Sequence, residues 1–319
     1  MLLAVNCAFD IAYGIPEPDI DECALYNDPC QHGVCIDRKA DYKCVCQEGW
    51  GGKNCSVALT GCKNNTCMND GVCTPWLLGE DEHRFECSCI SGFDGQICQH
   101  RTTFSLSGNS YIKVSSNHTE GYELHMQFRT TLGNVILAIG TGTGNKFFNL
   151  QLVDGRLVLK SDLNSHFERY GLSIGGRGEL NNTEWQKVYV AVTDTHFILG
   201  INDRAQITDP IHSNSDLDTV FHNTYFGGIE AEQQILAQEA PFLTGCVQDI
   251  ILDDKKITEE DFEVTDAGKS GAGQRDVEQV NTLVGCPRKP VCQPNPCQSE
   301  EICTDLWNDF QCFSTINKT

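Results

Sequence analysis

The spacing of its cysteines is the feature that most constrains how this chain folds. The 319 residues contain 19 cysteines, and twelve of these form two consecutive groups of six that both end in C-x-C-x8-C. Cysteines at this density indicate disulfides that form in an oxidising compartment, so we expect an extracellular or secretory-lumen protein. The two groups are Cys23, Cys30, Cys35, Cys44, Cys46 and Cys55, followed by Cys62, Cys67, Cys73, Cys87, Cys89 and Cys98.

The distribution of cysteines also divides the chain into regions. Residues 99–245 contain none, whereas Cys246 and Cys286 are followed by a third cluster. Units of ~35 residues are too small for a self-sufficient core, and three bridges each would stabilise them instead. Each group of six permits fifteen pairings, among which the residues alone do not decide.

The cysteine-free region reads as many short strands. Apolar residues alternate in segments such as "YELHMQFRTT" and "WQKVYVAVTD", where Val188, Val190 and Val192 share one face. Gly, Asn and Asp separate the segments at hairpin spacing. We therefore expect an all-β sandwich.

The net charge of -21 restricts the classes of partner. A chain this acidic repels polyanions, so nucleic acid is not expected and heparin-like chains are poor candidates. Apolar runs stay shorter than the ~20 residues that span a bilayer, so any membrane attachment would use a span outside this chain. Extracellular proteins remain the expected partners, a second copy of the chain among them.

The two six-cysteine groups resemble EGF-like modules, with "CQEGWGGKNC" and "CISGFDGQIC" as their closing turns. The resemblance implies pairing of the first cysteine with the third, the second with the fourth and the fifth with the sixth. The implied pairs are Cys23–Cys35, Cys30–Cys44, Cys46–Cys55, Cys62–Cys73, Cys67–Cys87 and Cys89–Cys98.

The middle region resembles a laminin G-like domain, a jelly-roll sandwich, through "LNNTEWQKV", "LGIND", "TYFGGI" and "FLTGCVQDIIL" in that order. The resemblance implies a Cys246–Cys286 bridge. The following "CQPNPCQSEEICTDLWNDFQC" begins another EGF-like unit, with implied pairs Cys292–Cys303 and Cys297–Cys312, and then departs from the pattern at "FSTINKT".

The expected organisation has five parts. They are an N-terminal segment (1–18), a calcium-binding EGF-like module (19–56), a second EGF-like module (58–99), a laminin G-like domain (103–286) and a partial EGF-like unit (288–319). The first segment is either a signal peptide, whose cleavage would remove Cys7, or the start of a fragment. Glycosylation sequons are expected to be used at Asn64, Asn117 and Asn181.

Acidic residues before the first module predict a calcium site. Ca2+ prefers six to eight oxygen ligands, and "DIDEC" supplies carboxylates that a Cys23–Cys35 bridge would hold beside Asp37. The stretch from Cys35 to Cys46 matches the C-x-D-x4-Y-x-C-x-C of calcium-binding EGF-like modules. That resemblance implies side-chain ligands from Asp19, Glu22 and Asp37 and backbone carbonyl ligands from Ile20 and Arg38. The alternative is a solvated acidic linker.

Other parts of the chain are not expected to bind calcium. "SVALTGC" before the second module has no carboxylate, and "RKPVC" before the last unit is basic. Many laminin G-like domains hold Ca2+ at the sandwich rim with an Asp, but Lys146 stands at the matching position here. A cation at that position would cancel the site.

Catalysis is not expected. Glu259, Asp261 and Glu263 match the E-x-D-x-E strand of some jelly-roll glycosidases. Glu260 between them would have to face the core, so an acidic turn is the favoured interpretation. The chain also lacks metal-binding histidine pairs and a nucleophile elbow.

The final segment "CTDLWNDFQC" resembles the C-x-D-L-W-x-x-F-x-C of units that follow laminin G-like domains in the Crumbs family. That family implies an extracellular adhesion and polarity segment of a single-pass apical membrane protein. A secreted matrix or guidance protein of the agrin, slit or eyes-shut type is the first alternative. A glycan-binding or glycosidase sandwich is the second. The sequence does not identify a partner protein.

Overall fold

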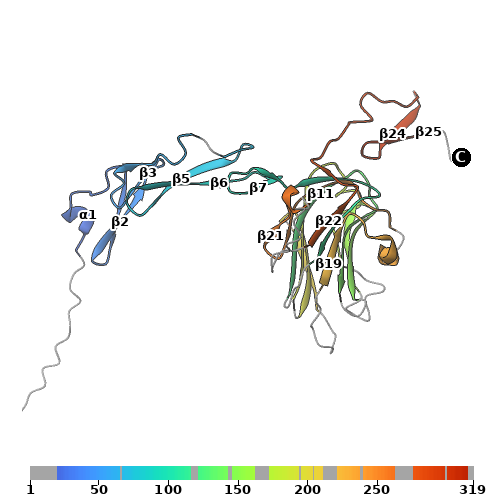
Figure 1. Ribbon diagram of the computed structural model, residues 1–319, viewed down its shortest axis with the longest axis horizontal. Coiled ribbons are helices and arrows are strands. Elements are labelled where there is room, and N and C mark those ends of the chain that lie inside the picture. Colours follow the sequence, from blue (N-terminus) through green and yellow to red (C-terminus); the bar gives the residue numbers. More distant parts are fainter. Residues whose placement is uncertain are drawn as a thin grey trace, which may run out of the picture. The chain divides into compact units, whose positions relative to one another are not determined.

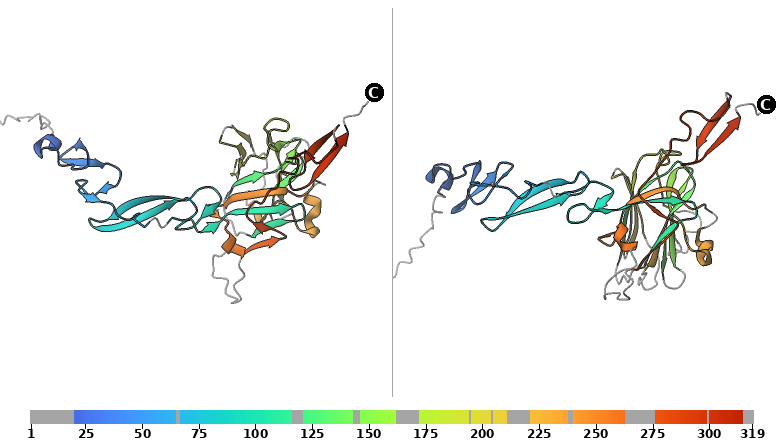
Figure 2. Two further views of the ribbon diagram at one scale, coloured as in Figure 1. Left: turned by 90° about the horizontal axis from the view of Figure 1, so that it is seen from above. Right: turned by 45° about the horizontal axis from the view of Figure 1, so that its top comes forward.

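The computed structural model contains two compact units. The first comprises Met1–Cys67 and Val72–Ser88, and the second Met68–Gly71 and Cys89–Thr319. The division therefore falls inside the segment expected to form the second EGF-like module. Figures 1 and 2 colour the elements along the chain. The residues described are 20–64, 67–115, 121–142, 146–161, 172–193, 195–203, 205–210, 221–237, 240–262, 276–298 and 300–314.

The first unit is built from short antiparallel pairs. A single helical turn, α1 (Glu22–Leu25), precedes the hairpin β1–β2, the small pair β3–β4 and the longer hairpin β5–β6. Side chains in these hairpins alternate between half-buried and exposed, because each hairpin has one covered face. The strands are β1 (Gly33–Arg38), β2 (Asp41–Cys46), β3 (Trp50–Gly51), β4 (Val57–Ala58), β5 (Val72–Leu78) and β6 (Glu82–Ser88).

The second unit is dominated by a β-sandwich, as expected, and Figure 2 shows its two layers. One sheet has the order β15-β14-β13-β12-β19-β10-β22 and the other β18-β17-β16-β11-β20-β9-β23, with β21 beside β20. The first sheet consists of β10 (Tyr111–Ser115), β12 (Val135–Gly142), β13 (Phe147–Val153), β14 (Arg156–Ser161), β15 (Leu172–Ile174), β19 (Phe221–Phe226) and β22 (Asp276–Val280). The second consists of β9 (Thr103–Ser107), β11 (Tyr122–Arg129), β16 (Gln186–Val192), β17 (His196–Ile201), β18 (Ala205–Pro210), β20 (Thr244–Leu252), β21 (Lys255–Lys256) and β23 (Leu283–Val284).

The main core lies between these sheets. Strand β11 shows the principle: Leu124, Met126 and Phe128 are buried while the residues between them face outward. Period-two alternation thus places one apolar face of each sheet against the other. Phe148 and Phe221 meet edge to face at 5.1 Å within this core.

A smaller apolar cluster covers part of the outer face of the seven-stranded sheet. The 3-10 helix η2 (Ala231–Ala237) belongs to the segment that packs there, and Tyr225 is fully buried beneath it. The Tyr225 hydroxyl donates a hydrogen bond of 2.6 Å to Glu230 Oε1. Burial, followed by this carboxylate, raises the pKa of Tyr225.

The closing loop of the second six-cysteine group packs on the sandwich through Asp249, a residue of β20. This loop contains β7 (Phe93–Asp94) and β8 (His100–Arg101). The Asp249 carboxylate accepts hydrogen bonds from Gly92 N at 3.2 Å, Thr102 Oγ1 at 2.7 Å and Gln127 Nε2 at 3.0 Å. Lys256 Nζ lies 3.7 Å away. These contacts explain why the loop belongs to the same compact unit as the sandwich.

The final hairpin, β24 (Glu301–Asp305) and β25 (Phe310–Ser314), also contacts the sandwich. Trp307, between the two strands, is 1% exposed. The guanidinium of Arg129 from β11 lies 5.9 Å from its ring centroid, and that of Arg288 lies 5.1 Å from it. The tryptophan of the "DLW" segment is therefore a buried anchor of this hairpin.

Disulfides join the cysteines in the pairs that the EGF-like and laminin G-like resemblances imply. In the described residues the bonded pairs are Cys23–Cys35, Cys30–Cys44, Cys46–Cys55, Cys62–Cys73, Cys67–Cys87, Cys89–Cys98, Cys246–Cys286, Cys292–Cys303 and Cys297–Cys312.

Candidate calcium site

The candidate site is organised by helix α1. Asp21 caps its N-terminus, because the Asp21 carboxylate accepts a hydrogen bond of 2.9 Å from Ala24 N. This capping is the usual role of an aspartate at that position. The Asp21 carboxylate therefore caps the helix. Glu22, the next residue, is only 9% exposed.

Asp37 reaches the same place from strand β1. Its Oδ1 accepts a hydrogen bond of 3.0 Å from Glu22 N, and the Cys23–Cys35 disulfide joins the two segments. Asp37 pairs across the hairpin with Tyr42, whose hydroxyl donates to Asn54 Oδ1 at 2.8 Å. Two segments that are 15 residues apart therefore bring their acidic residues together.

This arrangement fits a hard divalent cation. Glu22 is buried, and burying a carboxylate costs free energy unless positive charge or hydrogen bonds compensate it. Glu22 and Asp37 offer carboxylate oxygens, the ligand type that Ca2+ prefers. Ile20 and Arg38, the predicted carbonyl ligands, flank these two residues. Asp19 lies outside the described residues, and the complete ligand set stays a prediction.

The position of Asp37 lacks a carboxylate in the second EGF-like unit and is occupied by another aspartate in the last one. Pro75 stands there in the second group, opposite Phe85, and Asp305 stands there in the last, opposite Phe310. Arg288 Nη2 donates to Asp305 Oδ2 at 2.5 Å, so a guanidinium already compensates that carboxylate. This ion pair is the physical reason to expect no calcium in the last unit.

Two other groups of potential metal ligands can be set aside on chemical grounds. Asp28 lies near Cys30 and Cys35, and Glu301 lies near Cys297 and Cys312. All four cysteines are in disulfides. A disulfide sulfur is not the thiolate that binds metals, so neither group is a metal site.

Comparison with known families agrees with these modules. A model of the laminin G domain matches residues 128–258, and a model of the EGF-like domain matches residues 23–54. The chain therefore contains a laminin G domain and an EGF-like domain.

The chain is also similar to several curated proteins. Mouse "Protein crumbs homolog 1" is 28% identical over 93% of this chain and 22% of its own length. Human "Protein eyes shut homolog" is 32% identical over 73% of the chain and 8% of its own length. The "Protocadherin-like wing polarity protein stan" of Drosophila melanogaster is 24% identical over 93% of the chain and 8% of its own length. The resemblance to Crumbs is thus confirmed, although the chain spans less than a quarter of each relative.

A solved structure of the LG1–3 region of the laminin alpha2 chain is also similar. It has a TM-score of 0.45 and 16% identity, and the match covers 66% of this chain and 38% of that one. Among the described residues, no helix has the length and apolar character that a membrane span requires.

The acidic segment after the last long strand of the laminin G domain forms a turn, as expected. Glu259–Phe262 is the 3-10 helix η3, and the Asp261 carboxylate accepts a hydrogen bond of 2.8 Å from Thr258 N. Glu260 lies 3.0 Å from His100 Nδ1. These acids therefore contact different groups and do not share one strand face. Glu263 lies outside the described residues.

The three glycosylation sequons have different surroundings. Asn64 is exposed, while Asn117 lies outside the described residues. Asn181 Nδ2 donates a hydrogen bond of 3.0 Å to the Thr131 carbonyl. A glycan at Asn181 would replace one of the two hydrogens on this nitrogen, so the hydrogen bond alone does not exclude attachment. Use of all three sequons stays a prediction.

At Lys146, just before β13, the backbone carbonyl accepts from Gly142 N at 2.8 Å. The expected absence of calcium at this rim stays a prediction.

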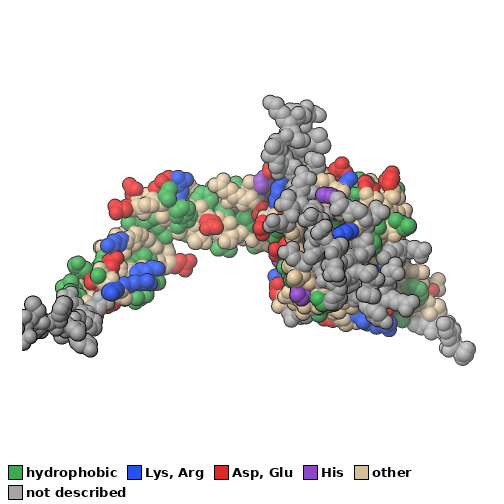
Figure 3. All heavy atoms as spheres, turned by 90° about the horizontal axis from the view of Figure 1, so that it is seen from below, with side chains coloured by type: hydrophobic (Ala, Val, Ile, Leu, Met, Phe, Trp, Pro, Cys, Tyr) green, Lys and Arg blue, Asp and Glu red, His purple; other side chains and the backbone are tan. Residues whose placement is uncertain are grey.

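The fold brings together basic residues that the sequence analysis did not connect. A hollow of about 530 Å3 on the first EGF-like module is lined by Arg38, Lys39, Lys43 and Lys53 together with Asp41. Figure 3 shows basic side chains close together on this module. The hairpin β1–β2 causes the gathering, because it folds residues 38–43 back towards residue 53. Net charge alone therefore does not describe this module's local surface.

Proposed function

We propose that this chain is the extracellular adhesion and polarity segment of a Crumbs-like, single-pass apical membrane protein. The 28% identity to mouse Protein crumbs homolog 1 over 93% of the chain supports the proposal. Trp307 also supports it, because this residue of the Crumbs-like "DLW" segment is buried. Its partners would be extracellular proteins, with a second copy of the chain as one option.

We further propose that Ca2+ stiffens the N-terminal end of the first EGF-like module. The single observation that carries this proposal is the approach of Asp37 to the Glu22 amide at 3.0 Å, across the Cys23–Cys35 bridge. Calcium held by Asp19, Glu22 and Asp37 would fix the chain leading into α1. It would thereby set the angle of any preceding module.

Calorimetric titration of the full chain with Ca2+ tests the site. We expect saturable one-site binding that weakens at least ~10-fold in Asp37→Ala, because a carboxylate ligand is lost. Asp305→Ala is the matched control: it removes the equivalent carboxylate from the last unit, where Arg288 already pairs with it. Unchanged binding in Asp37→Ala would refute the site.

A secreted matrix or guidance protein remains the alternative, supported by the 32% identity to human eyes shut homolog. Sequencing the full-length transcript separates the two proposals. A membrane span downstream of the modules favours the Crumbs-like protein, and a stop codon without a span favours the secreted one.

A further inference from the structure

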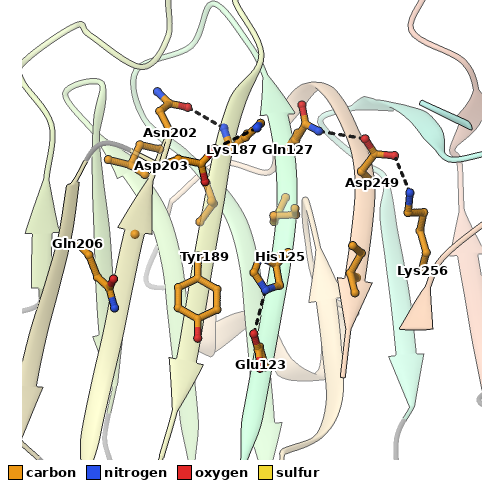
Figure 4. Close-up of a pocket in the computed structure, with 15 residues that line it drawn as sticks. Glu123, His125, Gln127, Lys187, Tyr189, Asn202, Asp203, Gln206, Asp249 and Lys256 are labelled. Carbon is orange, nitrogen blue, oxygen red and sulfur yellow. Dashed lines mark hydrogen bonds and ion pairs between the residues drawn. The ribbon is translucent and has the colours of Figure 1, made fainter. Parts of the chain in front are cut away.

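The outer face of the eight-stranded sheet has a hollow of about 660 Å3 that lies apart from the calcium site. Figure 4 shows the side chains that line it. A volume of this size is within the ~300–1,000 Å3 that is typical of small-ligand sites. Most of its lining residues come from the strands β11, β16, β17, β18 and β20. Lys256 comes from β21, and Asn202 and Asp203 come from the turn between β17 and β18.

One straight cross-strand row crosses the hollow. Gln206 pairs with Gly200, Gly200 with Tyr189, and Tyr189 with His125. Neighbouring strands lie ~4.8 Å apart. Because Gly200 has no side chain, the side chains of Tyr189 and Gln206 stand on either side of a gap roughly 9–10 Å wide. The register of three strand pairs thus creates a slot.

Aromatic rings form one wall of this slot. The rings of Tyr189 and His125 lie 4.7 Å apart with 36° between their planes. Glu123 orients the His125 ring, because its Oε1 lies 2.9 Å from His125 Nε2. Burial is the main reason that the pKa of Tyr189 is raised, so the hydroxyl remains a neutral group at physiological pH.

The charged groups around the slot largely compensate one another. Lys187 Nζ lies 3.0 Å from Asp203 Oδ2, and Lys256 Nζ lies 3.7 Å from Asp249 Oδ1. Glu123 adds one negative charge beyond these pairs. On the opposite wall, Gln206 provides an amide with both donor and acceptor groups. The slot therefore combines apolar ring surface, neutral hydrogen-bonding groups and little net charge.

We propose that this slot binds a neutral glycan of one to three hexose or N-acetylhexosamine units. The C–H groups on one face of a sugar ring would pack against Tyr189, since aromatic faces carry partial negative charge. The sugar hydroxyls would exchange hydrogen bonds with Gln206 and Glu123 across the gap left by Gly200. Sulfated and sialylated chains are disfavoured by the residual negative charge. The inference is independent of the calcium site and of membrane attachment.

Saturation-transfer NMR on the full chain, with its own N-glycans trimmed, tests the proposal. N,N′-diacetylchitobiose and lactose are the neutral probes, and a heparin-derived tetrasaccharide is the charged one. We expect saturable transfer to at least one neutral probe and none to the tetrasaccharide. Gly200→Val fills the slot with a good strand former, so we expect at least ~10-fold weaker binding.

Thr208→Val is the matched control, because it introduces the same side chain on the neighbouring row of β18. It should leave binding unchanged. Tyr189→Ala and Gln206→Ala decide the question if Gly200→Val does not fold, and each should weaken binding. Failure of both neutral probes to bind at about 10 mM, equal binding in the wild type and these variants, or preferred binding of the tetrasaccharide would overturn the proposal.

Discussion

Asp249 illustrates how much a single side chain contributes in this molecule. It lies in strand β20 with a positive φ of 48°, where the register between β11 and β20 shifts. This backbone irregularity turns its carboxylate towards Gly92 and Thr102, from a segment about 150 residues earlier. No sequence pattern around residue 249 reveals those partners, because the contacts form only after the sandwich is complete.

Replacing Asp249 by Ala should destabilise the second unit by ~2–4 kcal/mol, because several buried donors and Lys256 lose their acceptor. Denaturant unfolding of the full chain, together with hydrogen exchange at the Gly92 amide, measures the effect. The control is Asp203→Ala, which removes an exposed ion pair with Lys187 and should cost no more than ~0.5 kcal/mol. Equal losses in both variants would contradict the role assigned to Asp249.

Tyr225 gives a prediction for alkaline pH. Below pH 10 its phenol is neutral in both the folded and the unfolded chain. Above pH 10 the unfolded chain loses the proton first, since burial raises the pKa in the folded state. Folding stability should therefore fall as the pH rises from 10 towards 11. Thermal unfolding at these pH values should show a smaller fall in Tyr225→Phe, and an identical fall would refute the assignment.

Whole elements were more predictable than single contacts. Alternation of apolar residues correctly predicted the β-sandwich, and the acidic segment at 259–262 is a turn, as its internal Glu260 suggested. Two features depended on tertiary structure and could not be predicted. The register that places Gly200 beside Tyr189 comes from strand pairing, and the packing of residues 89–101 on the sandwich comes from Asp249.

The hairpin β24–β25 should depend on Trp307. In Trp307→Ala the sandwich residue Arg129 loses one of its two aromatic partners, the other being Trp185, and the hairpin loses its buried anchor. We expect at least ~10-fold faster hydrogen exchange in 301–314, with exchange in β11 little changed. Phe310→Ala, which truncates a 40% exposed side chain in the same hairpin, should have a much smaller effect. Unchanged protection in Trp307→Ala would show that the anchor is not needed.

At the scale of the whole molecule, two kinds of stabilisation coexist. Among the described residues, the first unit has short hairpins and five disulfides, whereas the sandwich has a continuous apolar core that includes Phe104, Phe128 and Phe226. Small disulfide-rich units lose their structure on reduction because they bury too little apolar surface. The core of a sandwich does not depend on bridges in the same way.

Mild reduction should therefore separate the two. With a thiol reductant at neutral pH, residues 20–64 should lose hydrogen-exchange protection while strands β11, β16 and β20 keep theirs. Loss of Cys246–Cys286 should still lower the stability of the sandwich by ~2–4 kcal/mol. Hydrogen exchange followed by mass spectrometry resolves both effects. Simultaneous loss of protection across both units would contradict this division.

The contact between Gly92 and Asp249 has a consequence for how such modules are exchanged between proteins. In this contact the Asp249 carboxylate of the sandwich accepts a hydrogen bond from the backbone N–H of Gly92, which has a φ of 92°. The first EGF-like module has Gly49, with a φ of 83°, at the same place in its closing turn. The Gly92 contact thus depends on a backbone shape that both complete modules share, whereas Thr102, after the second module, adds a side-chain donor. In a lineage that shuffles exons, a new neighbour with the same glycine turn would keep this one hydrogen bond from the start, while the side-chain contacts of His100 and Asp94 would have to evolve afterwards.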